Sequence, residues 1–382
     1  MKLHKLSTLL LAAAALIAAG CQETLEYTDV VFFTGTETSA TTSLYVEGPT
    51  SLGLTVTSSC KMSETITVSV EIDASAIDTY NEANGTSYVM LPDGSYDLAS
   101  SVFTIESGSS VSNPTNFEIL SMDDFNDGDL YCVPITLTGT SNGMKILEAS
   151  KTIYVVISQI ITTQAPNLQG SNYVSFPTTI NNSTYSDLSA CTMEARVKMD
   201  RWQTSSPYIS SIVGVEENFL LRFGDVSCDN NQLQYAGRGA SVTSVDSFNT
   251  DTWYHVYVVD DGSTLTLYVD GEQQGTTDSS GKDAIDLGWN YCDGFHVGFS
   301  ETGRKLYGTV SEVRVWTRAL TVTELENNQC YVDPSSEGLL GYWRLDELDE
   351  DGYFTDLTGN GNYGEPSSTS LVWEEIKCPV VD

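Results

Sequence analysis

The fold of this chain is indicated most clearly by residues 253–271, which read WYHVYVVDDGSTLTLYVDG. Two runs of β-prone residues flank an Asp-Gly pair, and a second Asp-Gly pair ends the stretch. Leu265, Leu267 and Val269 alternate with other residues in the second run, so that one face of an extended strand is apolar. Because Asp-Gly is a strong signal for a tight hairpin turn, the stretch predicts a β-hairpin with one buried face.

The same pattern of short β-prone runs continues through most of the chain. Runs rich in Val, Ile, Thr, Tyr and Phe alternate with turns of Gly, Asn, Asp and Ser, and helical periodicity is almost absent. One helical turn is expected over residues 74–81, with Asp73 as its cap and Asn84-Gly85 ending the segment. Strands in the first part of the chain are expected at Val30–Thr34, Ser51–Ser58, Glu64–Ile72, Phe117–Leu120, Tyr131–Thr138 and Lys151–Ser158. This pattern is typical of all-β sandwich domains.

The chain is expected to contain two such domains. Residues 27–161 form the first, and residues 169–382 form the second. Between them, residues 162–168 contain Pro166 and small polar residues that break the strand pattern, and this stretch is interpreted as a linker.

Three runs of the second domain resemble, in order and spacing, the laminin-G-like and pentraxin-like lectin fold. They are TMEARVK at 192–198, the hairpin at 253–271, and YGTVSEVRVW at 307–316. The resemblance implies a concanavalin A-like jelly-roll sandwich. The run at 341–364, GYWRLDE followed by GNGNYG, resembles a segment that usually opens this domain, although here it closes the chain. We assign it to displaced edge strands of the same sandwich; a separate small module is the alternative.

The first domain resembles the N-terminal domain of unassigned function that is found on Bacteroidetes outer-membrane lipoproteins. The matching runs are DTYN at 78–81, NGT at 84–86, Leu91-Pro92 with Tyr96, and YCVP at 131–134. They are turn and packing signals that carry no chemistry. We expect an immunoglobulin-like sandwich that acts as a spacer.

The N-terminus has the organisation of a lipoprotein signal peptide over residues 1–20. A short basic start precedes an apolar run at residues 9–19, which is too short to span a bilayer. The run AAGC at 18–21 resembles a bacterial lipobox, so we expect cleavage before Cys21 and lipid attachment there. Residues 21–26 then form an acidic tether that resembles a surface-export signal, which predicts the cell surface of the outer membrane. The alternative is an ordinary signal peptide that ends in Cys.

The formal net charge of −35 makes nucleic-acid binding implausible, since that function needs a basic surface. No CxxC motif is present, which excludes zinc ribbons and thioredoxin-type chemistry. Export permits disulfides, and we expect Cys330 to pair with Cys378 and Cys228 with Cys292. Cys191 is expected to be a buried free thiol.

No catalytic constellation is evident in the sequence. The nearest matches to the glycanase pattern E-x-D-x-x-E, at 71–73 and 347–351, lack its acids or read as a loop, and HExxH, GxSxG and phosphate loops are absent. His255 shares a strand face with Trp253 and Tyr257 and is interpreted as structural. We therefore expect a protein without enzymatic activity.

A calcium site is expected near the C-terminus. Carboxylate and amide oxygens are hard ligands that suit calcium, and glycines between them allow carbonyl groups to turn inward. The alternative is a turn with solvated acids. The candidate ligands are Asp346, Asp356, Asn360 and Asn362.

A sugar site is expected in the loops of the second domain. Aromatic rings stack on the apolar faces of pyranose rings, while guanidinium and amide groups bind hydroxyls. For each aromatic residue, the alternative is a structural role, in which the ring packs from a loop onto the hydrophobic core. The candidates are Trp202, Tyr208, Tyr235, Arg238, Trp289 and Tyr291.

These features predict a surface lipoprotein that binds glycans and captures oligosaccharides for outer-membrane uptake proteins, with the lipid as its only membrane contact. The second hypothesis is a surface adhesin or accessory subunit that binds another protein, and the third is a glycoside hydrolase. A glycan-binding protein should expose aromatic rings in a concave loop cluster. An adhesin should show a flat apolar patch, and a hydrolase should show facing carboxylates.

Overall fold

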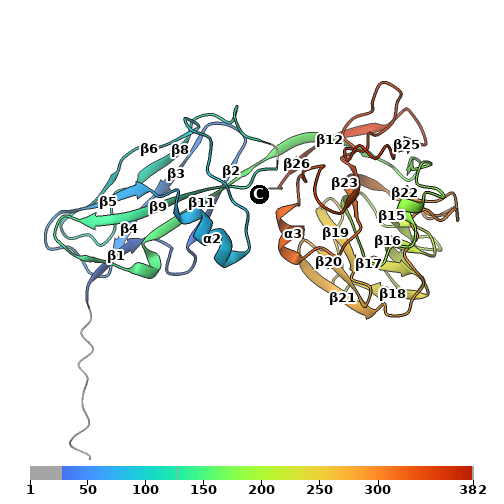
Figure 1. Ribbon diagram of the computed structural model, residues 1–382, viewed down its shortest axis with the longest axis horizontal. Coiled ribbons are helices and arrows are strands. Elements are labelled where there is room, and N and C mark those ends of the chain that lie inside the picture. Colours follow the sequence, from blue (N-terminus) through green and yellow to red (C-terminus); the bar gives the residue numbers. More distant parts are fainter. Residues whose placement is uncertain (1–27, 127, 381–382) are drawn as a thin grey trace, which may run out of the picture.

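The computed structural model describes residues 28–126 and 128–380. These residues form two β-sandwich domains arranged end to end (Figure 1). Each domain has its own hydrophobic core. The predicted signal peptide, the lipid attachment at Cys21 and the tether over 21–26 lie outside the described residues. Within the described part, no helix is long and apolar enough to cross a membrane.

The first domain packs a five-stranded sheet against two three-stranded sheets. The five-stranded sheet has the order β2 (Thr41–Val46), β11 (Thr152–Gln159), β9 (Tyr131–Thr140), β5 (Ile66–Ile72) and β7 (Val102–Ile105). The smaller sheets are β10 (Lys145–Ile146), β1 (Val30–Phe33) and β4 (Val56–Ser58), and β3 (Thr50–Leu54), β8 (Thr115–Ile119) and β6 (Tyr96–Leu98). The predicted alternation in β5 is confirmed, because Ile66, Val68 and Val70 are buried between exposed neighbours.

Helix α2 (Ala76–Asn84) is the predicted helical segment of the first domain. It ends at Gly85, whose φ of 66° lies in the left-handed region that favours glycine. The predicted cap is wrong: the helix starts after Ser75, and the Asp73 carboxylate accepts a 2.6 Å hydrogen bond from the Ser75 hydroxyl instead. A short 3-10 helix, η1 (Glu148–Ser150), precedes β11.

The second domain consists of two large sheets, here called sheet I and sheet II. Sheet I has the order β21 (Glu272–Asp278), β20 (Thr264–Val269), β19 (Trp253–Asp260), β14 (Cys191–Met199), β23 (Gly308–Trp316), β12 (Ile161–Asn167) and β26 (Val372–Cys378), and β24 (Leu339–Trp343) also pairs with β23. Sheet II has the order β18 (Ala240–Thr243), β17 (Cys228–Gly237), β16 (Phe219–Asp225), β15 (Ser210–Val215), β22 (His296–Val297), β13 (Val174–Ser175) and β25 (Glu365–Pro366). A 3-10 helix, η2 (Ser183–Tyr185), and helix α3 (Val322–Asn327) complete the domain.

The hairpin predicted from residues 253–271 is confirmed as β19 and β20. The two strands pair from Val256 with Val269 to Asp260 with Leu265. The alternating residues of β20 that were expected to face the core are buried. They join side chains from sheet II in one core, which is the sandwich arrangement that the sequence predicts.

The stretch interpreted as a linker is in fact a strand. Only Ile160 separates β11 from β12, and β12 pairs along its whole length with β26, from Ile161 with Cys378 to Asn167 with Val372. On its other side β12 pairs with β23 at Asn167 alone. A strand that is paired along one side tolerates the missing N–H of Pro166. Figure 1 shows β12 running beside β26 from one domain into the other.

The C-terminal segment belongs to the same sandwich, because β24, β25 and β26 pair with β23, β13 and β12. A disulfide joins Cys330 to Cys378, as expected. Cys191 is a buried free thiol, also as expected. The predicted pairing of Cys228 with Cys292 is wrong, since both are free.

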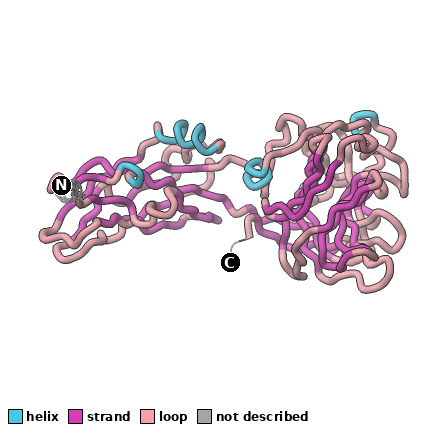
Figure 2. Tube along the Cα trace, turned by 90° about the horizontal axis from the view of Figure 1, so that it is seen from below, coloured by secondary structure: helices cyan, strands magenta, loops and turns pink. Residues whose placement is uncertain are grey.

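The two domains also contact each other through side chains. The Lys377 ammonium pairs with the Glu47 carboxylate across the junction. The ring of Tyr331 lies so close to Gly128 that a side chain there would clash. Seen from below in Figure 2, the junction is narrow compared with either sandwich. The first domain therefore extends away from the second and leaves most of the second domain's surface uncovered.

Candidate functional site

The outer face of sheet I is largely closed by the C-terminal half of the domain. Helix α3 and the segment after it pack on this face, where Leu325 is buried with Tyr257, Trp316 and Tyr342. The short helix starts at a capping box, in which the side chains of Thr321 and Glu324 bind each other's backbone N–H groups. The outer face of sheet II is covered in part as well, since Ser211, Arg222 and Gln234 on it are buried.

A cluster of charged residues is sealed beneath this cover. Glu194 is fully buried, and its carboxylate accepts a 2.7 Å hydrogen bond from the Trp316 indole. His255 Nε2 lies 2.9 Å and Arg314 Nη1 lies 3.4 Å from the other oxygen. Burial opposes ionisation of Glu194, but Arg314 and His255 hold its pKa below the usual value. Burial also lowers the pKa of His255 to about 4, so this histidine is neutral at pH 7.

The second carboxylate of the cluster, Glu312, is held in a similar way. It pairs with Arg314, accepts a 2.6 Å hydrogen bond from the Tyr342 hydroxyl, and lies 3.1 Å from Arg344 Nε. Only 3% of Glu312 is exposed. Because Glu194 and Glu312 are both buried, the cluster belongs to the interior of the domain and does not form an open site.

The outer face of sheet II carries a row of polar side chains across four strands. Ser211, Arg222, Gln234 and Thr243 are neighbours in the register of β15 to β18. Arg222 donates from Nε and Nη2 to the Gln234 carbonyl oxygen at 2.9 and 2.7 Å, and Gln234 in turn donates to the Thr243 hydroxyl at 3.0 Å. Arg222 also pairs with Asp225 at 3.0 Å. These bonds fix the donors and acceptors of the row in one orientation.

Glu216 lies on the same face, just after β15. Its carboxylate is almost completely buried and binds the Ser300 hydroxyl and the Arg304 guanidinium. Ser300 also bonds to Ser211 at 2.7 Å, and Arg304 pairs with Glu301 at 2.9 Å. The loop at 300–304 is therefore fixed over one part of the sheet.

A polar hollow of about 290 Å³ lies beside this loop. Its charged lining comes from Glu216, Glu217 and Arg222, and the rest comes from small residues of the β17–β18 hairpin, namely Ala236, Gly237, Gly239, Ala240 and Ser241. Small side chains leave room for a ligand close to the backbone. The hollow thus combines acceptors and donors with open space.

Two exposed aromatic rings lie on the loop between β21 and β22, which passes the β17–β18 hairpin. The rings of Trp289 and Tyr291 are stacked, with centroids 4.7 Å apart and planes 14° apart. They are 38% and 40% exposed. The pKa of the Tyr291 hydroxyl is raised by the Cys292 thiol, by burial and by the carboxylates of Glu217 and Glu301. The same loop contacts the β17–β18 hairpin, where Arg238 donates a 3.2 Å hydrogen bond to the Asp283 carbonyl.

The aromatic loop is anchored to the sandwich by Asp286. The Asp286 carboxylate accepts hydrogen bonds from the Ser186 hydroxyl at 2.8 Å and from the Gly288 N–H at 3.0 Å. Its backbone N–H donates to the Asn218 side chain at 2.9 Å, and Asn218 belongs to the hairpin that carries Glu216. The stacked rings therefore have a fixed position relative to the polar hollow.

The structure removes Tyr235 and Arg238 from the sugar-facing candidates. Tyr235 is fully buried, because it occupies a core-facing position of β17, and its hydroxyl donates to the Asn218 carbonyl. Arg238 pairs with the buried Asp260 and donates to the Tyr235 hydroxyl at 3.3 Å. Both residues anchor the β17–β18 hairpin, so neither presents a free face to a ligand.

Trp202 and Tyr208 lie in the loop before β15. Trp202 is half-buried and packs edge-on against Phe223 of the core, with ring centroids 5.0 Å apart. Tyr208 is 40% exposed, but it precedes β15 whereas Glu216 follows it, so the two lie at opposite ends of that strand. Of the six candidates, the structure brings only Trp289 and Tyr291 into contact with each other on the surface.

The residues that sequence reasoning missed are Arg222, Gln234, Glu216 and Arg304. The available signal was in FLLRFGD at 219–225, where one charged residue interrupts an apolar run. A charged residue at this position of a strand must project from the face opposite the core. The partners Glu216 and Arg304 lie in turns and gave no comparable signal.

The proposed calcium ligands do not fit a metal site. Both oxygens of Asp356 accept hydrogen bonds from the chain, including those of the Thr358 hydroxyl at 2.6 Å and the Asn362 side chain at 3.2 Å. The Asn360 amide donates to the Leu340 carbonyl at 3.0 Å. Asp356 is therefore the acceptor of a buried turn. Among the described residues, no group of three or more His, Cys, Asp or Glu is arranged to hold a metal ion.

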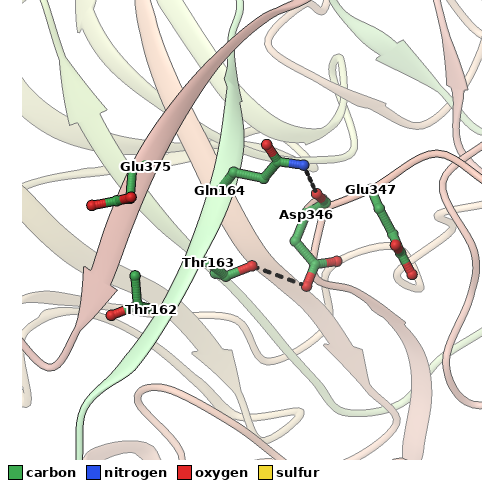
Figure 3. Close-up of a pocket in the computed structure, with 6 residues that line it drawn as sticks. All are labelled: Thr162, Thr163, Gln164, Asp346, Glu347 and Glu375. Carbon is green, nitrogen blue, oxygen red and sulfur yellow. Dashed lines mark hydrogen bonds between the residues drawn. The ribbon is translucent and has the colours of Figure 1, made fainter. Parts of the chain in front are cut away.

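Asp346 is held elsewhere, in a shallow acidic hollow shown in Figure 3. Its carboxylate accepts a 3.3 Å hydrogen bond from the Thr163 hydroxyl, and its backbone carbonyl accepts one of 2.9 Å from the Gln164 amide. These bonds attach the segment after β24 to β12. Asp346 thus serves the packing of the C-terminal segment.

Comparison with known proteins agrees with this architecture. A family described as an N-terminal domain matches residues 26–144, and a family of the concanavalin A-like lectin/glucanases superfamily, laminin G, matches residues 168–326. No curated protein matches the chain. A solved structure of a candidate carbohydrate binding protein from Bacteroides ovatus is 28% identical, covers 90% of this chain and 97% of its own, and gives a TM-score of 0.57.

Two further solved structures are similar to smaller parts of the chain. EndoBT-3987 from Bacteroides thetaiotamicron is 18% identical over 34% of this chain and 30% of its own, with a TM-score of 0.29. A heptameric SAP-like pentraxin from Limulus polyphemus is 16% identical over 44% of this chain and 80% of its own, with a TM-score of 0.31. The family matches and the two sandwiches show that an N-terminal β-sandwich domain precedes a second β-sandwich domain, which is similar to the laminin G domains of the concanavalin A-like superfamily.

Proposed function

We propose that this chain is a lipid-anchored cell-surface protein whose second domain binds glycans on the outer face of sheet II, without catalysis. The observation that carries the proposal is the exposed, stacked pair of Trp289 and Tyr291 beside a polar hollow. The similarity to the Bacteroides ovatus protein, which covers nearly the whole of both chains, supports the same function.

The chemistry of the face suits a sugar. A pyranose ring has apolar C–H faces, and the exposed ring of Trp289 or Tyr291 offers a flat surface against which such a face loses its water. Hydroxyl groups of the same or the next sugar can donate to Glu217 and accept from Arg222, both of which line the hollow. The contact is shallow, so an affinity on the order of micromolar to millimolar is expected.

The absence of catalysis is supported by how the carboxylates are used. Glu194 and Glu312 are sealed beneath α3. Glu216 faces the hollow, but Ser300 and Arg304 already bind both of its oxygens. A glycoside hydrolase needs two carboxylates on either side of the scissile bond, one of them free to transfer a proton. Of the two carboxylates that line the hollow, Glu216 is thus occupied, and Glu217 alone does not supply that pair.

The surface location completes the proposal. A lipid at Cys21 would place many copies on one membrane, and many weak sites on one surface bind a polymeric glycan more tightly than one site does. The first domain would hold the binding face away from the membrane. We propose that the captured oligosaccharides pass to uptake proteins of the outer membrane.

A glycan-array screen of the chain from Gln22 to Asp382 tests the proposal. The wild-type chain is expected to bind at least one class of oligosaccharide. The double variant Trp289→Ala/Tyr291→Ala should bind the same glycan at least about tenfold more weakly, because truncation of central aromatic contacts commonly costs this much. Binding should be quantified by titration calorimetry.

The matched control is Tyr45→Ala, which removes an aromatic ring that is 46% exposed on the first domain. It should bind glycan as the wild type does, and all three proteins should melt at similar temperatures. Unchanged glycan binding by the double variant would contradict the proposed site. Reducing ends released from a bound glycan would contradict the absence of catalysis.

A further inference from the structure

Arg196 on β14 is a buried cation without a carboxylate partner among the described residues. Its side chain projects from the outer face of sheet I, and only 3% of the residue is exposed. Nη2 donates a long hydrogen bond of 3.3 Å to the Lys377 carbonyl, and Nη1 has no hydrogen-bond partner in residues 28–126 and 128–380. The guanidinium lies over the Trp253 ring, 5.0 Å from its centroid.

Such an arrangement is unusual for a residue with a purely structural role. Arginines inside proteins normally pair with a carboxylate, since a buried charge without a partner is costly. Arg314, on the adjacent strand, is paired in this way with Glu194 and Glu312. Burial lowers the pKa of Arg196 to about 10, although the carboxylates of Glu312 and Asp270 act in the opposite direction. Within the described residues, the Arg196 guanidinium therefore lacks the paired carboxylate that a buried arginine normally has.

An open hollow lies directly against this guanidinium. It has a volume of about 200 Å³, and its lining includes Arg196, Trp253, Tyr254, Asp270 and Gln329. Asp270 is exposed to solvent and uses one carboxylate oxygen to accept a 2.8 Å hydrogen bond from the backbone N–H of His255. The lining thus offers a guanidinium donor, a carboxylate acceptor and an amide that both donates and accepts.

We propose that this hollow binds an acidic sugar residue, whose carboxylate pairs with Arg196 and whose hydroxyls bind Asp270 and Gln329. The planar fork of a guanidinium matches a carboxylate in geometry, and the pair gains charge-assisted hydrogen bonds. Asp270 selects against a bare inorganic anion, which it repels. A sugar acid brings hydroxyl donors to that same carboxylate, so both charged walls of the hollow are satisfied.

The site is separate from the one on sheet II. Arg196 and Asp270 belong to sheet I and its hairpin, and the two sheets present opposite outer faces of the sandwich. The second site therefore goes beyond the proposed glycan binding by Trp289 and Tyr291. It would allow the domain to hold a charged polysaccharide at two points.

The test uses glucuronate as the probe, with glucose as its neutral counterpart and inorganic sulfate as a bare anion. Titration of the chain from Gln22 to Asp382 by calorimetry or NMR is expected to give millimolar binding of glucuronate, and glucose and sulfate should each bind at least about tenfold more weakly. Glucuronate should also raise the melting temperature, because a ligand that binds only the folded state stabilises it.

Arg196→Gln should lose at least about tenfold in glucuronate affinity and the associated rise in melting temperature. Gln329→Ala removes a less central contact and should weaken binding by a smaller factor, which keeps the test informative if the first variant folds poorly. Tyr45→Ala, which removes an exposed ring on the first domain, should bind glucuronate as the wild type does. The proposal would be overturned if the wild type bound glucose or sulfate as tightly as glucuronate. It would also be overturned if Arg196→Gln bound glucuronate as tightly as the wild type does.

Discussion

Replacing Glu194 with Ala is expected to lower the free energy of unfolding by about 3–5 kcal/mol, as removal of one partner from a buried ion pair typically does. The carboxylate is fully buried, and Trp316, His255 and Arg314 all lie within 3.4 Å of it. Its loss leaves an indole N–H and part of a guanidinium charge without partners in a site that water does not reach. Urea unfolding at pH 7 measures the effect.

The matched control is Glu148→Ala, which breaks the exposed pair between Glu148 and Lys151. Exposed pairs of this kind contribute about 0–1 kcal/mol, so the control should remain close to the wild type. Glu194→Gln keeps an acceptor for Trp316 but loses the charge, and should fall between the two. If Glu194→Ala unfolds at the same urea concentration as the control, Glu194, His255, Arg314 and Trp316 do not form a buried network whose members depend on one another.

Removing the disulfide between Cys330 and Cys378 is expected to cost about 4 kcal/mol. The two residues are 48 positions apart, and closing a loop of this length restricts the unfolded chain by roughly that amount. The bond also attaches the segment after α3 to the end of β26, and β26 is the strand that holds β12 at the domain junction. The double variant Cys330→Ala/Cys378→Ala should therefore melt at a clearly lower temperature.

The corresponding control is Cys228→Ala/Cys292→Ala, which removes two thiols that form no disulfide. Its stability should change by less than about 1 kcal/mol, as for most substitutions away from the core. A reducing agent should lower the melting temperature of the wild type and of this control equally, and should leave the Cys330→Ala/Cys378→Ala variant unaffected. Equal stability of the two double variants would show that the disulfide contributes little.

The sequence was sufficient to predict the fold class because the alternation in strands such as β5 and β20 is strict. It was insufficient for the domain junction. Residues 162–168 look like a linker because their partner strand, β26, lies more than 200 residues further along the chain. Pairing over such a distance leaves no pattern in the local sequence. Pro166 does leave a local signal, and that signal indicates a break between strands.

The candidate site was predicted in part. Trp289 and Tyr291 were identified because aromatic residues among Gly, Asn and Asp are typical of loops. Tyr235 was placed in a loop by the same reasoning, although β17 continues to Gly237 and turns that ring into the core. Asp356 resembled a metal ligand because the residue types of a calcium loop and of a hydrogen-bonded Asx turn are the same. Only the donors around its oxygens distinguish the two.

Glycan binding by Trp289 and Tyr291 is tested most directly by hydroxyl-radical footprinting of the full chain with and without the glycan found on the array. Oxidation of an aromatic side chain follows its exposure to solvent, and Trp289 and Tyr291 are both exposed in the free protein. The glycan is expected to protect these two residues, while Tyr45 on the first domain is oxidised at an unchanged rate. Protection confined to other residues, with Trp289 and Tyr291 oxidised as in the free protein, would contradict this expectation.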